Sequence, residues 1–279
     1  MKKLGVTLPE NGQVGQSEFL DIVKKSAAQS ITPVVQGVGD RPYPGMYITE
    51  ELLLKKLGTD DYGKLIDGKL SFQDPRVVEV FRYVQQLVDA GAYPKSFSTI
   101  KLGESHYYFH TKPQGLMFPM GSFYTGRAFT TPDKGGQPVG FPLGIMNFPA
   151  FQNAACNNCK TIAVGGSYAI NSGSKHPEAA AALLNEMATV EMGNLWLTTR
   201  LAQTGIKTDP SKITGEYQAY FKELAQRDAD NKFFVGIPYD HLKGECRDAW
   251  VQVVNGAFPG GLMKVEDAVK QLDSSCHKS

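Results

Sequence analysis

Hydrophobic residues recur at helical spacing along several stretches of the chain. In the clearest stretch, six apolar residues share one helix face: Val77, Val80, Phe81, Val84, Leu87 and Val88. Asp74 followed by Pro75 is a typical helix start, and Gly91 stands where a helix-ending glycine belongs. The pattern predicts an amphipathic helix that begins after Asp74 and ends before Gly91.

Further helical and extended segments alternate along the sequence. More helices are predicted at residues 17–28, 177–197, 246–254 and 265–272. Short apolar runs between the helices predict strands at 31–35, 115–118, 139–143 and 162–170. Because strands alternate with helices, the expected fold class is α/β.

The composition is that of an ordinary globular protein: of 279 residues, 42% are hydrophobic and 20% are charged. The formal net charge is +1, and no stretch gathers Lys and Arg into a face that could neutralise phosphates. We therefore expect no nucleic-acid partner. The apolar run after Met1-Lys2-Lys3 is far shorter than the ~7 to 15 residues of a signal-peptide core, so we expect no export signal at this N-terminus.

Four cysteines, Cys156 and Cys159 in a C-N-N-C motif together with Cys246 and Cys276, allow three pairings if all are oxidised. The flanks of C-N-N-C suggest a loop that enters a strand, which favours structural disulfides and an oxidising compartment. A metal or thiol module built on Cys156 and Cys159 is the alternative.

Catalytic motifs are weak. Gly165-Gly166-Ser167-Tyr168-Ala169 falls one residue short of the G-x-S-x-G nucleophile elbow, which leaves a serine hydrolase using Ser167 as a second alternative. His106 and His110 could share a helix face as metal ligands, but without the glutamate of H-E-x-x-H they fit surface or packed histidines better. No Walker loop or dinucleotide fingerprint is present, so no cofactor is expected.

The order of the segments is more informative than any one motif. Residues 115–123, which read G-L-M-F-P-M-G-S-F, look like a segment usually written G-K-A-A-M-x-x-x-G-S-W. Gly165-Gly166-Ser167-Tyr168-Ala169-Ile170, followed by Ser174-Lys175-His176-Pro177-Glu178-Ala179-Ala180, is a closer match. Together with 71–75 and 89–91, these segments resemble the extracellular solute-binding proteins of family 1, the maltose-binding-like group, with Phe123 in place of the usual Trp.

The resemblance implies a type II periplasmic-binding-protein-like fold. Residues 1–163 and 206–279 would form its C-terminal lobe, and residues 164–205 would be a crossing strand and helix of the N-terminal lobe. It also implies a non-enzymatic receptor, periplasmic or extracellular in the intact family member. Such a receptor would bind a sugar in an interlobe cleft and dock on the permease of an ABC importer.

Sugar recognition needs flat rings and a few polar groups on loops at strand ends. By the resemblance, two loops would face the ligand. The expected ligand-binding residues are Asp40, Arg41, Tyr43 and Tyr47 in the first loop, Gly121, Ser122, Phe123 and Tyr124 in the second, and Tyr168 on the crossing strand. Core packing is the alternative for Tyr43 and Phe123 and the favoured interpretation for Tyr168 and Trp250, while Arg41 could instead pair with Asp40.

The apolar face of the predicted helix 177–197 would lack its usual sheet partner in this chain. Solvating that face forfeits about 25 cal/mol for each Å² that would otherwise be buried. We therefore expect the helix to repack on its own lobe, to pair with another copy, or to make the chain sticky.

Overall fold

The computed structural model describes residues 1–110, 115–258 and 261–276. Within it the chain forms two compact units. The first comprises Met1–Pro119, Met146–Ala163 and Asp230–Ser279, and the second comprises Met120–Ile145 and Val164–Ala229. One boundary between the two units falls between Ala163 and Val164. Residues 120–145 and 206–229 differ from the expected division, because they group with 164–205.

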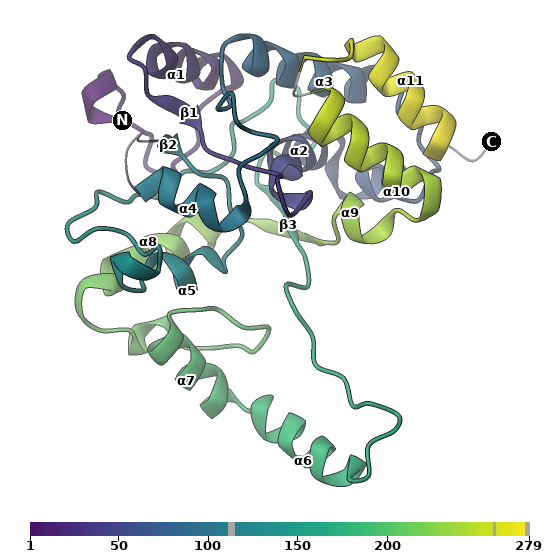
Figure 1. The fold of residues 1–279 in the computed structure, drawn as a ribbon. Helices are drawn as coiled ribbons and strands as arrows, with labels where there is room; N and C mark the ends of the chain where they lie inside the picture. Colours follow the sequence, from purple (N-terminus) through teal and green to yellow (C-terminus); the bar gives the residue numbers. More distant parts are fainter. Residues whose placement is uncertain (111–114, 259–260, 277–279) are drawn as a thin grey trace. The chain divides into compact units, whose positions relative to one another are not determined.

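The first unit contains most of the regular structure (Figure 1). Its longer helices are α1 (Gln16–Ala28), α2 (Tyr47–Ile66), α3 (Pro75–Asp89), α4 (Leu102–His110), α10 (Gly244–Val251) and α11 (Val265–Cys276). Its short helical turns are η1 (Lys2–Leu4), η2 (Tyr43–Met46), α9 (Pro238–His241) and the π-helical turn η6 (Gln252–Ala257). Its strands are β1 (Thr32–Val34), β2 (Gly115–Met117), β3 (Cys159–Ile162) and β4 (Lys232–Val235).

The strands form two parallel pairs. β1 pairs with β2 in the register Thr32 to Gly115 and Val34 to Met117. β3 pairs with β4 from Cys159 opposite Lys232 to Ile162 opposite Val235. Since parallel neighbours need crossover connections, helices lie between the paired strands in sequence, and the α/β class is confirmed.

Helix α3 forms as the pattern predicts. The Asp74 carboxylate caps it by accepting a hydrogen bond from the Arg76 backbone N–H at 2.9 Å. Val77, Val80 and Phe81 are fully buried against a core to which α2 also contributes. The predicted helices near residues 17–28, 246–254 and 265–272 correspond to α1, to α10 with η6, and to α11.

Helix α2 lies deep in the first unit, and the sequence pattern does not predict it. Besides Leu52, Leu53 and Leu54 it buries the charged residues Glu50, Glu51, Lys55 and Lys56. The helix is interrupted at Gly58, whose φ of 74° is not helical. Glycine adopts this positive φ at low cost because it has no Cβ. With charged residues on its buried surface, α2 has no clear apolar stripe.

The buried charges of α2 hold the loop that carries C-N-N-C. Lys56 Nζ donates to the Gln152 carbonyl at 3.1 Å and pairs with Glu79 at 2.6 Å. Lys55 Nζ donates to the Asn157 carbonyl, and Glu51 accepts from the Thr161 backbone N–H at 3.0 Å. These partners satisfy both lysines and one carboxyl oxygen of Glu51, which would otherwise be costly to bury, so α2 fixes the entry into β3.

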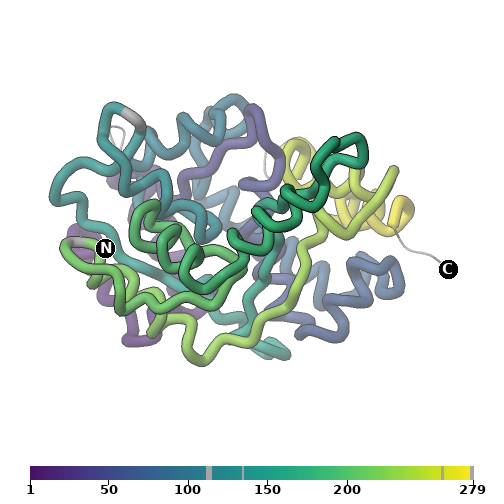
Figure 2. Tube along the Cα trace, turned by 90° about the horizontal axis from the view of Figure 1, so that it is seen from below, coloured from purple at the N-terminus to yellow at the C-terminus, as the bar shows by residue number. Residues whose placement is uncertain are grey.

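The last two helices of the chain, α10 and α11, pack against each other in the first unit. In Figures 1 and 2, α11, the yellow segment, lies beside the yellow-green α10, and a Cys246–Cys276 disulfide joins the two helices. Trp250 on α10 is fully buried against Phe72, with ring centroids 6.0 Å apart. The expected core position of Trp250 is confirmed.

The second unit is smaller and mostly helical. Its elements are α5 (Tyr124–Ala128), η3 (Pro132–Lys134), α6 (Pro177–Met187), α7 (Val190–Arg200), η4 (Pro210–Lys212), η5 (Gly215–Tyr217) and α8 (Gln218–Asp228). Its small core contains Leu197, Ile213 and Phe221, and the rings of Phe129 and Tyr217 stack beside it at 4.1 Å.

Three predicted elements differ from the structure. The run 139–143 forms no strand, and the strand expected at 162–170 ends at Ile162, so Val164 and Tyr168 are exposed. The helix expected over 177–197 is two helices, because the Thr189 hydroxyl caps a new one by accepting from the Met192 N–H. The apolar face of the first of these helices, α6, does not repack on its own lobe, because α6 buries no residue.

Among the described residues no helix is long and apolar enough to span a bilayer.

Candidate functional site

Three tyrosine rings gather in the first unit at the start of α2. Tyr43 begins η2 and Tyr47 begins α2, and their ring centroids lie 6.2 Å apart. Tyr239 of α9 brings a third ring to 6.3 Å from Tyr43. All three rings are half-buried, so they combine fixed positions with accessible faces. We call Tyr43, Tyr47 and Tyr239 the tyrosine cluster.

One cation and one buried carboxyl group lie next to the tyrosine cluster. The guanidinium carbon of Arg247 lies 4.2 Å from the ring centroid of Tyr239, at cation–π distance. Burial, and secondarily the neighbouring Tyr43, raise the pKa of Tyr47 well above its usual range, so its hydroxyl stays protonated. Burial together with the adjacent Glu51 raises the pKa of Glu50 to about 8. The cluster therefore offers flat faces, a neutral phenol and one cation.

The loop that carries Tyr43 is held tightly from several sides. A Cβ on Gly39 would lie 2.4 Å from the Thr99 carbonyl oxygen, so the loop approaches the segment before α4 as only glycine allows. The amide of Asn255, in η6, donates to the Pro42 carbonyl at 2.6 Å. These contacts pre-organise the tyrosine cluster before any ligand arrives.

Asp40 and Arg41 take different positions in this loop. The Asp40 carboxylate accepts a hydrogen bond from the Leu102 backbone N–H at 2.8 Å, where α4 begins. Its main contact is thus structural rather than with Arg41. The Arg41 side chain is exposed.

A pocket of about 460 Å³ lies beside the same loop, within the first unit. The loop contributes Val38 and Pro42, and the segment from α10 through η6 contributes much of the remainder. Its lining residues are Val38, Pro42, Val251, Gln252, Asn255, Gly256, Ala257 and Leu262. Apolar walls with two amide groups suit a ligand that has both C–H faces and hydroxyl groups.

The second predicted loop opens the second unit. Phe123 is 43% exposed, and its ring covers Gly121 so closely that a Cβ there would lie 2.7 Å from it. Ser122 is exposed, and its carbonyl accepts from the Thr125 hydroxyl at 3.0 Å. Tyr124 is buried, which raises the pKa of its hydroxyl, so it supports α5 rather than facing solvent.

The sequence interpretation favoured core packing for Tyr168, and the structure contradicts it. Tyr168 is 70% exposed in a stretch without regular structure, because the strand ends at Ile162. Ser167 lies in the same exposed stretch, and the next helix, α6, begins only at Pro177. The strand–turn–helix geometry of a nucleophile elbow is therefore missing at Ser167.

The four cysteines form two disulfides, one inside the C-N-N-C motif and one between α10 and α11. Disulfides join Cys156 to Cys159 and Cys246 to Cys276. Since both sulfurs of C-N-N-C are bonded to each other, the loop offers no thiolate to a metal. His106 and His110 do share the buried side of α4, with rings 6.2 Å apart, and Phe118 packs edge-on against His106 at 5.0 Å.

Sequence reasoning missed Tyr239, Arg247 and Asn255. They lie about 200 residues from Tyr43 and reach it only through β4, α9 and α10. Only Tyr239 had a sequence feature that could have suggested it as a site residue. It follows the short apolar run Phe233-Phe234-Val235 by a few residues, as a residue on a loop at a strand end would.

No family model matches this sequence, and no curated protein matches it. Solved structures do match. A protein solved in work on xylan utilization by the thermophilic bacterium Caldanaerobius polysaccharolyticus is 18% identical, with a TM-score of 0.75 over 98% of this chain and 67% of its own. A chitin oligosaccharide binding protein gives 0.74 at 18% identity, over 98% of this chain and 65% of its own. The bacterial solute receptor AcbH, described as having an exclusive preference for β-D-galactopyranose, gives 0.73 at 17% identity, over 94% and 64%.

These likenesses define the fold: the chain has the periplasmic-binding-protein-like fold of bacterial solute receptors. The expected fold class is thereby confirmed. The chain spans about two thirds of the length of the structures it matches.

Proposed function

We propose that this chain is a sugar-binding part of the receptor for an ABC importer, and that it binds without catalysis. The observation that carries the proposal is the half-buried tyrosine cluster, in which the loop before Tyr43 is held by Asn255 and Gly39 while Tyr47 and Tyr239 are fixed on α2 and α9. Aromatic faces pack against the C–H faces of sugar rings, and neighbouring hydroxyls and amides satisfy sugar hydroxyls. The binding of chitin oligosaccharide and galactopyranose by proteins of similar fold supports this choice of ligand.

The remaining expected ligand residues belong to the same proposal. Ser122 and Phe123 offer an exposed hydroxyl and an exposed ring, and Tyr168 offers a second exposed ring. Asp40 and Arg41 flank the tyrosine cluster in sequence, and Gly121 and Tyr124 shape the backbone on either side of Ser122 and Phe123. Within the first unit, we assign contact with the sugar to Tyr43 and Tyr47 first.

The proposed partners follow from the proposed role. The intact receptor would work outside the cytoplasmic membrane, periplasmic or extracellular, and would deliver its solute to a permease. The two disulfides agree with an oxidising compartment. The exposed apolar residues of α6 and α7, with Leu183 at 61% and Leu195 at 48%, favour self-association of this chain.

Calorimetric titration of the full chain with galactose, xylobiose and chitobiose tests the role. We expect binding of at least one sugar, and a loss of about tenfold in affinity for Tyr43→Ala, because one stacked ring contributes about 1 to 1.5 kcal/mol. Tyr107→Ala removes an exposed tyrosine from α4, outside the cluster, and should leave the affinity unchanged. A folded chain that binds none of these sugars, or an equal loss in both variants, would contradict the proposal.

A further inference from the structure

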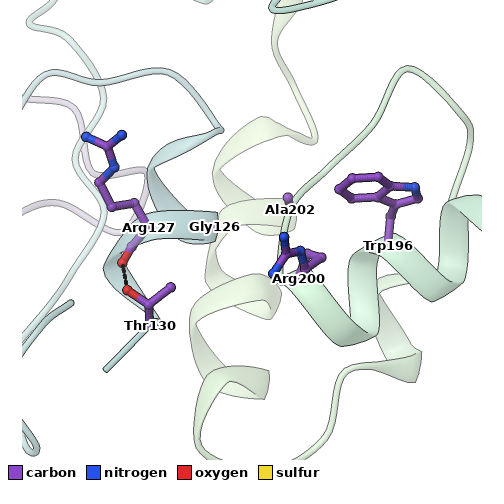
Figure 3. Close-up of a pocket in the computed structure, with 6 residues that line it drawn as sticks. All are labelled: Gly126, Arg127, Thr130, Trp196, Arg200 and Ala202. Atoms are coloured by element: carbon purple, nitrogen blue, oxygen red, sulfur yellow. Dashed lines mark hydrogen bonds between the residues drawn. The ribbon is translucent and has the colours of Figure 1, made fainter. Parts of the chain in front are cut away.

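The second unit contains a pocket of about 370 Å³ between α5 and α7 (Figure 3). Gly126 and Arg127 lie on α5, and Trp196 and Arg200 lie on α7. Its lining residues are Gly126, Arg127, Thr130, Trp196, Arg200 and Ala202. The lining includes the Trp196 indole and the Arg200 guanidinium and no carboxylate, while the Arg127 guanidinium points away from these two side chains in Figure 3.

The two arginines supply positive charge that nothing nearby neutralises. Neither Arg127 nor Arg200 forms an ion pair with any residue in the described part of the chain, whereas Arg76, Arg82 and Arg227 each do. The whole chain carries a formal net charge of only +1, so the missing ion-pair partners do not simply reflect an excess of basic residues. The Arg200 guanidinium beside the Trp196 indole favours a ligand that has both a negative charge and an apolar face.

Trp196 and Arg200 are placed to act together. They are four residues apart on α7, so they project from the same face of the helix. Trp196 is half-buried, which fixes its ring and leaves part of it open to the pocket, and Arg200 is exposed beside it. The Thr130 hydroxyl donates to the Arg127 carbonyl at 2.7 Å, and this contact fixes the end of α5.

We propose that this pocket binds a saccharide that carries a carboxylate, a uronic acid residue. The sugar's C–H face packs on the Trp196 indole, and its carboxylate accepts paired hydrogen bonds from the Arg200 guanidinium. The pocket would be a saccharide site of the second unit, in addition to the tyrosine cluster of the first, and this inference rests on the proposed sugar-binding role.

A carboxylate matches this pocket better than a neutral group does. The planar guanidinium donates two parallel hydrogen bonds to the two oxygens of a carboxylate, and such charge-assisted bonds are about twice as strong as neutral ones. A neutral sugar would form only neutral-acceptor hydrogen bonds with the same guanidinium donors, and these replace bonds to water with little net gain. The pocket should therefore select for the acid group more than for the ring it is attached to.

Titration of the full chain with D-galacturonic acid and with D-galactose tests this directly, because the two ligands differ only at C6. We expect about tenfold or greater preference for the acid, weakening as salt concentration rises. Arg200→Gln should remove the preference, and Arg200→Lys should keep part of it. Lys212→Gln, which removes an exposed charge elsewhere in the second unit, should leave the preference intact.

Tryptophan fluorescence locates the ligand. The chain has two tryptophans, and Trp250 is fully buried in the first unit, so a change on adding galacturonate reports on Trp196 and should vanish in Trp196→Phe. Equal affinity for galactose and galacturonate, or an Arg200→Gln variant that keeps the preference, would overturn this inference. The sugar-binding role would stand if Tyr43→Ala still weakened galactose binding. A folded chain that binds neither ligand nor the other sugars would overturn both.

Discussion

The Cys246–Cys276 disulfide should be a main covalent contributor to the stability of the first unit. It joins α10 to α11 across a sequence separation of 30 residues, whereas Cys156–Cys159 spans only 3. A cross-link restricts the unfolded chain more when it closes a longer loop. The chain-entropy relation gives about 3.6 kcal/mol for a loop of ~30 residues and about 1.6 kcal/mol for a loop of ~3 residues at room temperature.

We therefore expect Cys246→Ala/Cys276→Ala to lower the free energy of unfolding by about 3 to 4 kcal/mol. Cys276 is 5% exposed, so the lost packing of its sulfur adds to the entropic term. The matched control, Cys156→Ala/Cys159→Ala, should lose about half as much or less. Each pair has one buried cysteine, Cys276 or Cys159 at 1% exposed, and neither double variant leaves a free thiol, so the main difference between the pairs is loop length.

Urea unfolding followed by fluorescence measures this difference. Trp250 lies on α10 in the same unit as Cys246, and a Trp196→Phe background removes the tryptophan of the second unit, so the signal follows the first unit. A control pair that loses as much stability as Cys246→Ala/Cys276→Ala would refute the loop-length reasoning. A loss below about 1 kcal/mol for the longer loop would refute it as well.

Two further predictions concern a buried acid and an exposed helix. Burial raises the pKa of Glu50 from 4.5 to about 8, so between these pH values the unfolded chain ionises while the fold keeps the proton, and wild-type stability falls as pH rises through this window. The side chain introduced by Glu50→Gln cannot ionise, so the difference between the free energies of unfolding of Glu50→Gln and wild type should shift in favour of the variant from pH 4.5 to pH 8. A difference that stays constant over this range would contradict the raised pKa. Leu183→Gln should reduce concentration-dependent association in sedimentation velocity because Leu183 is 61% exposed, whereas Glu178→Gln on the same helix should not; equal behaviour of the two variants would exclude α6 as the contact.

The sequence by itself determined the elements that bury one face. Helix α3 was predictable because its cap and its apolar stripe are local, and both lie within residues 74–91. The same holds for α1 and α11, whose apolar positions also recur at helical spacing. The order of the segments also identified the fold, since order and spacing survive where identity to solved receptors is only 14 to 18%.

Helix α2 shows what local patterns cannot show. Helical periodicity arises where one face of a helix meets the core and the other meets solvent. Residues 48–58 of α2 are buried all round, charges included, so this stretch has no such pattern. Its lysines and glutamate find partners at Gln152, Asn157 and Thr161, roughly 100 residues away. Only the folded chain brings such partners into reach.

The candidate site was likewise predictable only in part. Tyr43 and Phe123 follow predicted strands, so the sequence could suggest them as ligand residues at strand ends. The tertiary structure alone decided that Tyr239 completes the tyrosine cluster, that Tyr168 is exposed, and that Trp196 and Arg200 share a pocket with Arg127. The physical reason is that a site is a meeting of distant segments, whose positions depend on packing rather than on the residues beside them in the chain.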